Sequence, residues 1–247
     1  MYERQLRLGA QAEGKFVWAA GALDHDDGRG RAYARSLGVD ADRAYGDWRE
    51  MLAAESARDD RVDLVTVATP NSTHFEITKA FLEGGFNVLC EKPMTMSVEE
   101  GEEIVKVAAK AGKICAVNYC YSAYPMVREM REIVRTGQVG KVRLIVTNFS
   151  HGHHGDASDA DNPRVRWRYD PAMAGVSGQF ADCGIHALHM ASFIAGDQVR
   201  KLSADFASTI GSRTLEGDAM VNLRLEGGTV GGLRARAAAV GRHPGLD

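Results

Sequence analysis

The strongest constraint on the fold is an alternation of short apolar runs with helical patterns in the first half of the chain. Residues 62–69, VDLVTVAT, are rich in β-branched residues and stop at Pro70, which has no N–H to give to a strand ladder. Residues 73–85, THFEITKAFLEGG, space their apolar positions three and four apart and close on two glycines, and residues 86–90, FNVLC, are apolar again. Strand, helix and strand in this order predict a parallel sheet with right-handed crossovers.

The alternation extends to both sides of this unit. Residues 16–23, FVWAAGAL, form a continuous apolar run ending at Asp24, which predicts a strand buried on both faces. Ser97 followed by Glu100 is a capping-box pattern that opens a helix, and residues 113–117 predict one more short strand. Helical patterns occupy RAYARSLG (31–38), WREMLAAES (48–56) and VEEGEEIVKVAAKAG (98–112).

The pattern changes after about residue 120, which predicts two domains, 1–120 and 121–247. Residues 151–177 are rich in Gly, Asp, Pro and Arg and predict a loop. Around this loop we expect helices at 124–140 and 178–196, a strand at 142–150, and antiparallel strands at 201–209, 219–227 and 229–240. The predicted fold class is α/β: a Rossmann-like parallel sheet, then an α+β domain with a mostly antiparallel open sheet.

Composition points away from nucleic acid and membranes. Charged residues make up 26% of 247 residues with a net charge of −3, so there is no field strong enough to hold nucleic acid or an anionic bilayer. No stretch approaches the roughly 20 apolar residues of a membrane span, and the polar N-terminus lacks the apolar core of a signal peptide. The four cysteines have no zinc-knuckle spacing and indicate free thiols. We therefore expect a cytoplasmic protein with a small-molecule partner.

The segment HGHHGD contains His151, His153, His154 and Asp156. Imidazole and carboxylate suit zinc or nickel. Loops rich in His and Gly are more often simply solvated, so we predict no metal site.

The tripeptide Glu91-Lys92-Pro93 follows the apolar run 86–90. Open α/β sheets place their ligand crevice at the carboxyl ends of their strands, so Lys92 is expected in that crevice. There its ammonium could donate to a substrate hydroxyl and stabilise an alkoxide as hydride leaves. The tripeptide alone favours an ordinary surface turn, and its position after a buried strand reverses that preference.

Asp182 and His186 lie four residues apart on the predicted helix 178–196, so both side chains should share one face. Removing hydride from a carbinol requires a base, and histidine titrates near neutral pH, so His186 can take the hydroxyl proton. Asp182 would orient the imidazole or bind a neighbouring hydroxyl. Such pairs also arise by chance on many helices. His189, three residues on, is a further candidate for the pocket or for the core.

Several motifs in order resemble the Gfo/Idh/MocA family, which includes glucose-fructose oxidoreductase and inositol dehydrogenase. They are TPNSTH, EKP, NYCYSAYP, TGQVGKVR and WRYDPAMAGVSGQFADCGIHAL, and the resemblance runs from about residue 16 to about residue 240. It implies a Rossmann domain followed by a domain whose open sheet serves in homo-oligomerisation. It also implies that Lys92, Asp182 and His186 are catalytic.

The resemblance further implies a nicotinamide cofactor. Asp24 stands where the family reads the ribose, and a carboxylate there accepts from a 2′-hydroxyl, which favours NAD. Arg29 and Arg31 nearby leave NADP open. The residues expected to line the dinucleotide are Asp24, Thr69, Pro70, Asn71, His74, Glu91, Lys92 and Asn118. Independently of the resemblance, aromatic and cationic residues near the domain junction could line a substrate pocket or simply pack there: Tyr119, Tyr121, Tyr124, Arg166, Trp167, Arg168 and His189.

The chain departs from the family at both ends. Its members begin with a strand and a G-x-G-x-x-G loop that receives the pyrophosphate, and Gly28-Arg29-Gly30 does not replace that loop. We expect a chain truncated at both ends that binds nicotinamide cofactors poorly. The function expected is hydride transfer between a sugar or cyclitol hydroxyl and NAD(P). The alternatives are a non-catalytic sensor with this fold and an inactive remnant.

Overall fold

The chain folds into two units, seen in a computed structural model that describes residues 2–152, 156–163, 165–208, 210–211 and 213–237. The first unit consists of Met1–Thr69 and Thr73–Val117, and the second of Pro70–Ser72 and Asn118–Asp247. Each unit has its own sheet.

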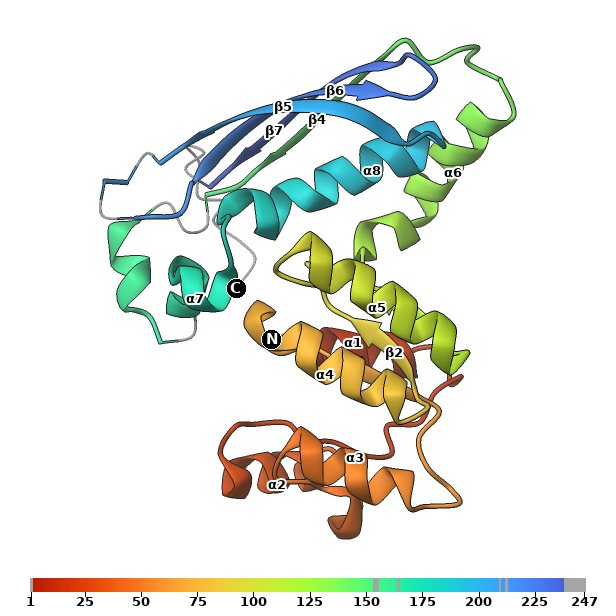
Figure 1. The fold of residues 1–247 in the computed structure, drawn as a ribbon, viewed down its shortest axis with the longest axis vertical. Coiled ribbons are helices and arrows are strands. Elements are labelled where there is room, and N and C mark those ends of the chain that lie inside the picture. The colour runs from red at the N-terminus through yellow and green to blue at the C-terminus, as the bar shows by residue number, and fades with distance from the viewer. Residues whose placement is uncertain (1, 153–155, 164, 209, 212, 238–247) are drawn as a thin grey trace. The chain divides into compact units, whose positions relative to one another are not determined.

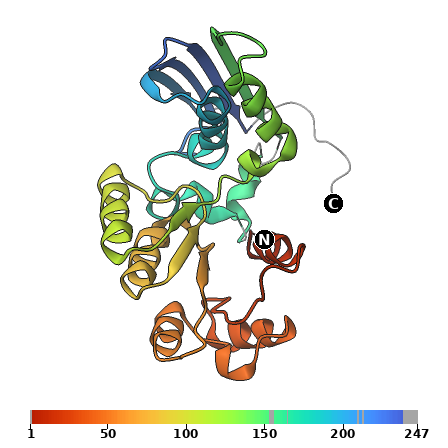
Figure 2. The same cartoon turned by 90° about the vertical axis from the view of Figure 1, so that its right-hand side faces the viewer.

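The first unit contains a three-stranded parallel sheet in the order β1-β2-β3. The helices α4 and α5 are the crossovers between its strands, and they lie side by side, with Lys79 Nζ 3.2 Å from Glu103 Oε1 (Figure 2). This architecture confirms the predicted Rossmann-like parallel sheet. The elements are β1 (Leu64–Val67), α4 (Asn71–Glu83), β2 (Asn87–Cys90), α5 (Val98–Ala111) and β3 (Cys115–Val117).

The core of this sheet is built from the apolar positions that define the sequence pattern. Phe81 of α4 packs edge-to-face on Phe86 with ring centroids 5.6 Å apart, and both are buried. Val67 and Val88 face them from the sheet, and Ile104 from α5. The apolar faces of the two helices and the buried strands therefore pack together in one apolar layer.

The start of α5 follows the predicted capping pattern in part. Ser97 Oγ accepts from Glu100 N (3.2 Å), as a capping box requires. The Glu100 carboxylate accepts from Met96 N (3.0 Å) rather than from the cap residue. The helix begins where the sequence predicts because the serine satisfies one of its first N–H groups.

The strand predicted at residues 16–23 is wrong. Its one ladder contact in the described residues is an isolated parallel bridge between Gly21 and Ala44, and Phe16 and Val17 are 53% and 88% exposed. A buried parallel strand needs hydrogen-bonded neighbours on both sides, and no described segment pairs with the outer edge of β1. An apolar run is therefore insufficient without a partner strand.

The segment after that run is helical from an earlier point than the pattern RAYARSLG indicates. Helix α2 (Asp27–Ser36) begins before residue 31, where that pattern starts, because Asp26 Oδ1 accepts from Arg29 N and caps it. The next helix, α3 (Trp48–Ser56), matches its predicted segment and is capped by Asp47. Outside this group, α1 spans Tyr2–Gln11 and a 3-10 turn, η1, spans Ala41–Arg43.

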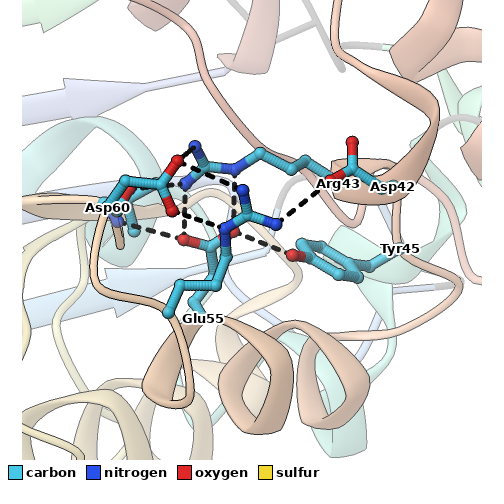
Figure 3. Close-up of polar contacts among 7 residues, drawn as sticks. Asp42, Arg43, Tyr45, Glu55 and Asp60 are labelled. Carbon is cyan, nitrogen blue, oxygen red and sulfur yellow. Dashed lines mark hydrogen bonds and ion pairs between the residues drawn. The ribbon is translucent and has the colours of Figure 1, made fainter.

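A buried ion pair holds this region together. The carboxylate of Glu55 on α3 is fully buried and accepts from Arg43 Nε (3.0 Å), Arg43 Nη2 (2.6 Å) and the Tyr45 hydroxyl (2.8 Å) (Figure 3). Val62 N donates to its second oxygen (3.0 Å). A buried charge with this many donors is compensated, and removing one partner would leave the other uncompensated.

The same contacts shift the pKa values of Glu55 and Tyr45. Burial raises the pKa of the Glu55 carboxyl, but the hydrogen bonds from Arg43, Tyr45 and Val62 outweigh burial and the net pKa is lowered. Burial and then the Glu55 carboxylate raise the pKa of Tyr45 to about 12. The network is therefore ionised as carboxylate, guanidinium and neutral phenol at neutral pH.

The second unit contains a four-stranded mixed sheet in the order β4-β7-β6-β5, which confirms the predicted α+β domain. Only β4 and β7 pair in parallel. Helix α8 runs along one face of this sheet, with α6 beside it (Figure 1), and the small side chains of Ala187 and Ala191 let α8 approach β4 and β7 closely. The elements are α6 (Pro125–Arg135), β4 (Leu144–Ser150), α8 (Ile185–Ala195), β5 (Val199–Ala207), β6 (Asp218–Leu225) and β7 (Val230–Arg236).

The other face of the sheet carries exposed apolar side chains: Leu144, Val146, Met220 and Val230. The segment predicted as a loop, 151–177, contains short helices, because aspartates at 156 and 170 cap two of them. They are the 3-10 helices η3 (Ala157–Asp161) and η4 (Arg166–Tyr169) and the helical turn α7 (Pro171–Ala174), and a further 3-10 turn, η2, spans Cys120–Ala123. Among the helices of the described chain, none combines the length and the apolar character needed to cross a bilayer.

The buried pair gives a stability prediction. Glu55→Gln removes the negative charge beside Arg43, and we expect the free energy of unfolding at pH 7, measured with urea, to fall by about 3 kcal/mol. Because the folded pKa of Glu55 is lowered, its contribution is present above the ordinary value of 4.5 and is lost as pH falls through the folded value. The difference between wild type and variant should therefore shrink in acid.

Glu102→Gln, an exposed position on α5, is the matched control and should change stability by less than about 0.5 kcal/mol. Equal stabilities of Glu55→Gln and Glu102→Gln at pH 7 would show that the buried network contributes nothing.

Candidate active site

Lys92 lies at the carboxyl end of β2, beside the carboxyl end of β1. The parallel register pairs Val67 with Cys90, and Glu91 N continues the ladder by donating to Val67 O (2.9 Å). Glu91 and Lys92 are 7% and 8% exposed. A lysine this buried differs from a surface-turn lysine, and it follows the strand at the edge where parallel sheets bind ligands.

The imidazole of His74 joins the two turns at this edge. His74 is 1% exposed, its Nδ1 lies 2.7 Å from Pro93 O, and its Nε2 lies 2.8 Å from Thr69 O. Pro93 follows Lys92 through a cis peptide bond. That His74 contacts the dinucleotide stays a prediction; in this structure both ring nitrogens face backbone carbonyls, and the side chain fixes the turn of Lys92 against the turn of Thr69.

Asp24 follows the segment 16–23 and has an arginine and a histidine beside its carboxylate. Its Oδ1 accepts from Asp26 N (2.9 Å) and Arg29 Nη2 (2.9 Å), and His25 Nδ1 lies 3.1 Å away. The hydrogen bond from Arg29 lowers the pKa of the Asp24 carboxyl. The contacts described above all involve Oδ1 on a side chain that is 31% exposed, so Oδ2 can accept a hydrogen bond from a hydroxyl.

Arg31 is engaged elsewhere. Its guanidinium binds Asp27 (2.5 Å) and Glu50 (2.6 Å) and donates to Ala44 O (2.6 Å). Of the two arginines that left NADP open, Arg29 is the one beside Asp24.

In the second unit, Asp182 and His186 lie on a continuous helix whose first turn is wider than an α-helix. Phe180–Gly184 form a π-helical turn, η5, in which Ile185 N donates to Phe180 O, and α8 continues from it. Gly184 permits the turn, because a Cβ there would lie 3.0 Å from Phe180 Cγ. The sequence predicted the helix and missed the π turn, which displaces Asp182 relative to an α-helical position.

Aromatic rings surround the buried imidazole of His186. Tyr121 meets it edge-on with centroids 4.8 Å apart, Tyr119 edge-on at 6.0 Å, and Phe149 nearly parallel at 6.3 Å. His189 stacks on Tyr119 at 4.0 Å, and burial lowers its pKa. Tyr119, Tyr121 and His189 are therefore brought to the predicted base.

A small, solvent-open pocket with a volume of about 30 Å³ lies beside Asp182. Arg168 Nε is 3.8 Å from Asp182 Oδ2, and the Arg168 guanidinium covers the Trp167 ring at 4.5 Å. On the opposite wall the Arg213 guanidinium lies 4.2 Å from the Tyr169 ring centroid. The pocket thus combines the carboxylates of Asp182 and Glu216 with hydrogen-bond donors, a set suited to a polyhydroxylated ligand.

The remaining predicted residues are placed as follows. Asn71, in the second unit, donates from Nδ2 to Ala174 O (3.0 Å), and Tyr124 is 54% exposed. Pro70 and Asn118 also belong to that unit. Lys92 lies in the first unit, so Lys92 and the Asp182–His186 pair are positioned by different units.

The histidine cluster is only partly described. His151 Nε2 lies 3.1 Å from Cys183 Sγ and 3.2 Å from Gln179 Nε2. His153 and His154 lie outside the described residues. Among the residues that are described, no three His, Cys, Asp or Glu side chains gather as a metal site would require.

Four polar side chains at the pocket were missed at the sequence level: Tyr169, Gln179, Arg213 and Glu216. Arg213 and Glu216 come from the connection between β5 and β6, where no periodicity or motif marks them. Their positions follow from tertiary contacts alone.

Two family models match nearly the whole chain. Residues 5–119 match "Oxidoreductase family, NAD-binding Rossmann fold", and residues 127–246 match "GFO/IDH/MocA C-terminal domain".

Individual proteins agree with these matches. The chain is 39% identical to the uncharacterized oxidoreductase YfiI of Bacillus subtilis (91% of this chain, 58% of that protein). It is 30% identical to D-xylose 1-dehydrogenase (NADP(+)) 2 of Haloferax volcanii (85% and 57%). An inositol dehydrogenase homolog from Azotobacter vinelandii, complexed with NAD+, superposes with a TM-score of 0.92 at 34% identity (97% and 62%). The chain therefore spans about three-fifths of the length of each relative.

The π turn gives a prediction for the helix that carries Asp182 and His186. Gly184→Ala forces a methyl group against the Phe180 ring, and we expect it to lower the free energy of unfolding by about 1–3 kcal/mol. Gly101→Ala in α5 is the matched control: its Cβ would meet ordinary contacts from 3.4 Å, so it should raise stability by about 0.5–1 kcal/mol. Thermal melts of the two variants should move in opposite directions, and an unchanged melt for Gly184→Ala would contradict the packing described.

Proposed function

The chain belongs to the Gfo/Idh/MocA oxidoreductase family, and on this premise we propose that it transfers hydride between a carbinol carbon of a sugar or cyclitol and a nicotinamide cofactor. The observation that carries the proposal is Lys92, a buried lysine at the carboxyl end of a parallel strand. The relatives support the substrate class, since one acts on D-xylose and another is an inositol dehydrogenase homolog.

Each side chain has a distinct role in the proposed reaction. His186 takes the hydroxyl proton, and the surrounding rings of Tyr119, Tyr121 and Phe149 keep its imidazole in place. Lys92 donates to the hydroxyl oxygen and stabilises the charge that develops there. Asp182 accepts from the substrate and is oriented by Arg168. The nicotinamide, when bound, supplies the hydride acceptor.

The first unit offers a donor and acceptor set that fits the adenosine ribose. Asp24 Oδ2 can accept from a 2′-hydroxyl, while Oδ1 holds Arg29. A 2′-phosphate would be repelled by Asp24 and attracted by Arg29, whose side chain is 63% exposed. We therefore propose NAD as the preferred cofactor, with weaker binding of NADP through Arg29.

The catalytic roles predict large losses of activity. His186→Asn and Lys92→Met should each lower kcat by about 10²–10⁴-fold, because each removes the group that handles the proton or the oxygen charge. The measurement is NADH formation from a panel of sugars and cyclitols. Both variants must melt cooperatively like wild type, and near-normal rates in either would refute its role.

Cofactor choice gives a separate prediction. Arg29→Met should weaken NADPH binding by about tenfold and change NADH binding by less than about twofold, because only the 2′-phosphate needs the guanidinium. Arg35→Met, an exposed change of the same kind in the last turn of α2, is the control. Nicotinamide fluorescence gives both affinities. Equal effects of the two substitutions on NADPH would remove Arg29 from the site.

Measuring sugar or cyclitol binding beside hydride transfer separates the enzyme from the alternative of a sensor. A sensor with this fold would bind the sugar or cyclitol without hydride transfer, even when NAD is bound. A remnant would bind neither and would melt without cooperativity.

The open sheet of the second unit supports a further proposal, that two copies of the chain pair through it. Its outer face exposes Leu144, Val146 and Met220 at 64%, 73% and 48%, more apolar surface than a strand facing water normally carries. Val146→Asp should shift the chain from dimer to monomer in analytical ultracentrifugation, whereas Glu102→Gln, an exposed change in the first unit, should not. A wild-type monomer at high concentration would contradict the proposal.

A further inference from the structure

The helix that carries Asp182 and His186 begins with backbone N–H groups for which no preceding helical turn supplies an acceptor. The first four N–H groups of any helix lack partners within it, and here they belong to residues 178–181. No side chain at the helix's own N-terminal residue caps them. Acceptors must come from elsewhere.

Glu216, which precedes β6, supplies most of these acceptors. Its Oε2 accepts from Gly178 N (2.8 Å), its Oε1 from Phe180 N (2.9 Å), and its backbone carbonyl from Gln179 N (3.0 Å). A negative charge at this end also interacts favourably with the helix dipole. One residue, distant in sequence, therefore satisfies three consecutive amides.

Ser177 completes the arrangement. Its hydroxyl donates to Glu216 Oε1 (2.7 Å), and its oxygen accepts from Ala181 N (3.2 Å). All four N–H groups thus have partners, and every partner is Glu216 or a side chain bound to Glu216.

The approach of Glu216 depends on a glycine. A Cβ at Gly178 would lie 2.7 Å from Glu216 O, a distance that side chains do not tolerate. The backbone beside Glu216 is itself fixed, because Gly217 N donates to Ala207 O (3.1 Å) and Ala237 N donates to Gly217 O (2.8 Å). The cap is therefore anchored to the ends of β5 and β7 and cannot follow the helix if it moves.

The geometry points to Glu216 as a positioning residue for the reaction, an inference that rests on the proposed function. Its carboxylate fixes the start of the helix against the sheet and thereby sets where Asp182 and His186 stand. Asp182 is two residues beyond the last amide that Glu216 holds, inside the π turn, so a displaced cap moves it directly. Glu216 also lines the pocket beside Asp182.

The test compares Glu216→Gln with Glu226→Gln in the full chain. Glutamine keeps one acceptor oxygen and removes the charge and the second acceptor, whereas Glu226 is exposed at the turn between β6 and β7. The readouts are kcat, KM, the thermal melt, and the imidazole NMR signal of His186, assigned with His186→Asn.

We expect Glu216→Gln to lower kcat by about 10- to 100-fold with KM within about threefold, and to shift the His186 signal. Glu226→Gln should change neither. Ser177→Ala should also lower kcat. The double variant of Glu216→Gln and Ser177→Ala should lower log kcat by less than the sum of the two single decreases, because both changes open the same cap. If Glu216→Gln fails to melt cooperatively, Glu216→Asp, which keeps the charge and shortens the reach, takes its place in each comparison.

If the cap only stabilises the fold, Glu216→Gln would lower the melting temperature and leave kcat and the His186 signal unchanged below the melt. That result would overturn the inference. If neither wild type nor variant turns over any sugar or cyclitol, the proposed function fails and the NMR signal still decides. A shift in Glu216→Gln then supports positioning, and an unchanged signal overturns it.

Discussion

The parallel pairing of β1 with β2 is the constraint on which the first unit's chemistry depends. Because Val67 and Cys90 are in register, the turns that follow them meet at one edge, and His74 bridges Thr69 O and Pro93 O. That bridge leaves Lys92 held between two fixed turns rather than on a free loop. A buried ammonium in a fixed place is what stabilisation of an alkoxide requires. In the second unit, Asp182 and His186 are held in place by a helix whose first turn is capped by Glu216, which precedes β6.

Most of the fold could be predicted from local sequence. Residues 62–117 gave the right order of strands and helices, because apolar spacing, a proline stop and an Ser97 cap all act over a few residues. The failure at 16–23 has a physical reason: strand formation needs a partner, and the partner is not encoded in the apolar run itself. The start of α2 was also missed, because the cap at Asp26 begins the helix ahead of the RAYARSLG pattern.

The site was predictable only where chemistry falls in a motif. Lys92, Asp182 and His186 stand out by residue type and by resemblance, and their roles stay predictions that the geometry supports. The π turn, the aromatic rings around His186, and the contacts of Arg213 and Glu216 depend on residues far apart in the chain. Such long-range contacts leave no periodicity to read. Asp24 illustrates the limit, since its neighbour Arg29 was visible and only the structure distinguished it from Arg31.

The central claim is that this chain moves hydride from a carbinol carbon to a nicotinamide. Its most direct test is to incubate the folded chain with NAD and sugars or cyclitols carrying deuterium on the carbinol carbon, and to locate the label by mass spectrometry and NMR. The account predicts deuterium at C4 of the reduced nicotinamide with wild type and none with His186→Asn. A folded chain that binds the cofactor and transfers no deuterium from any member of the panel would contradict it.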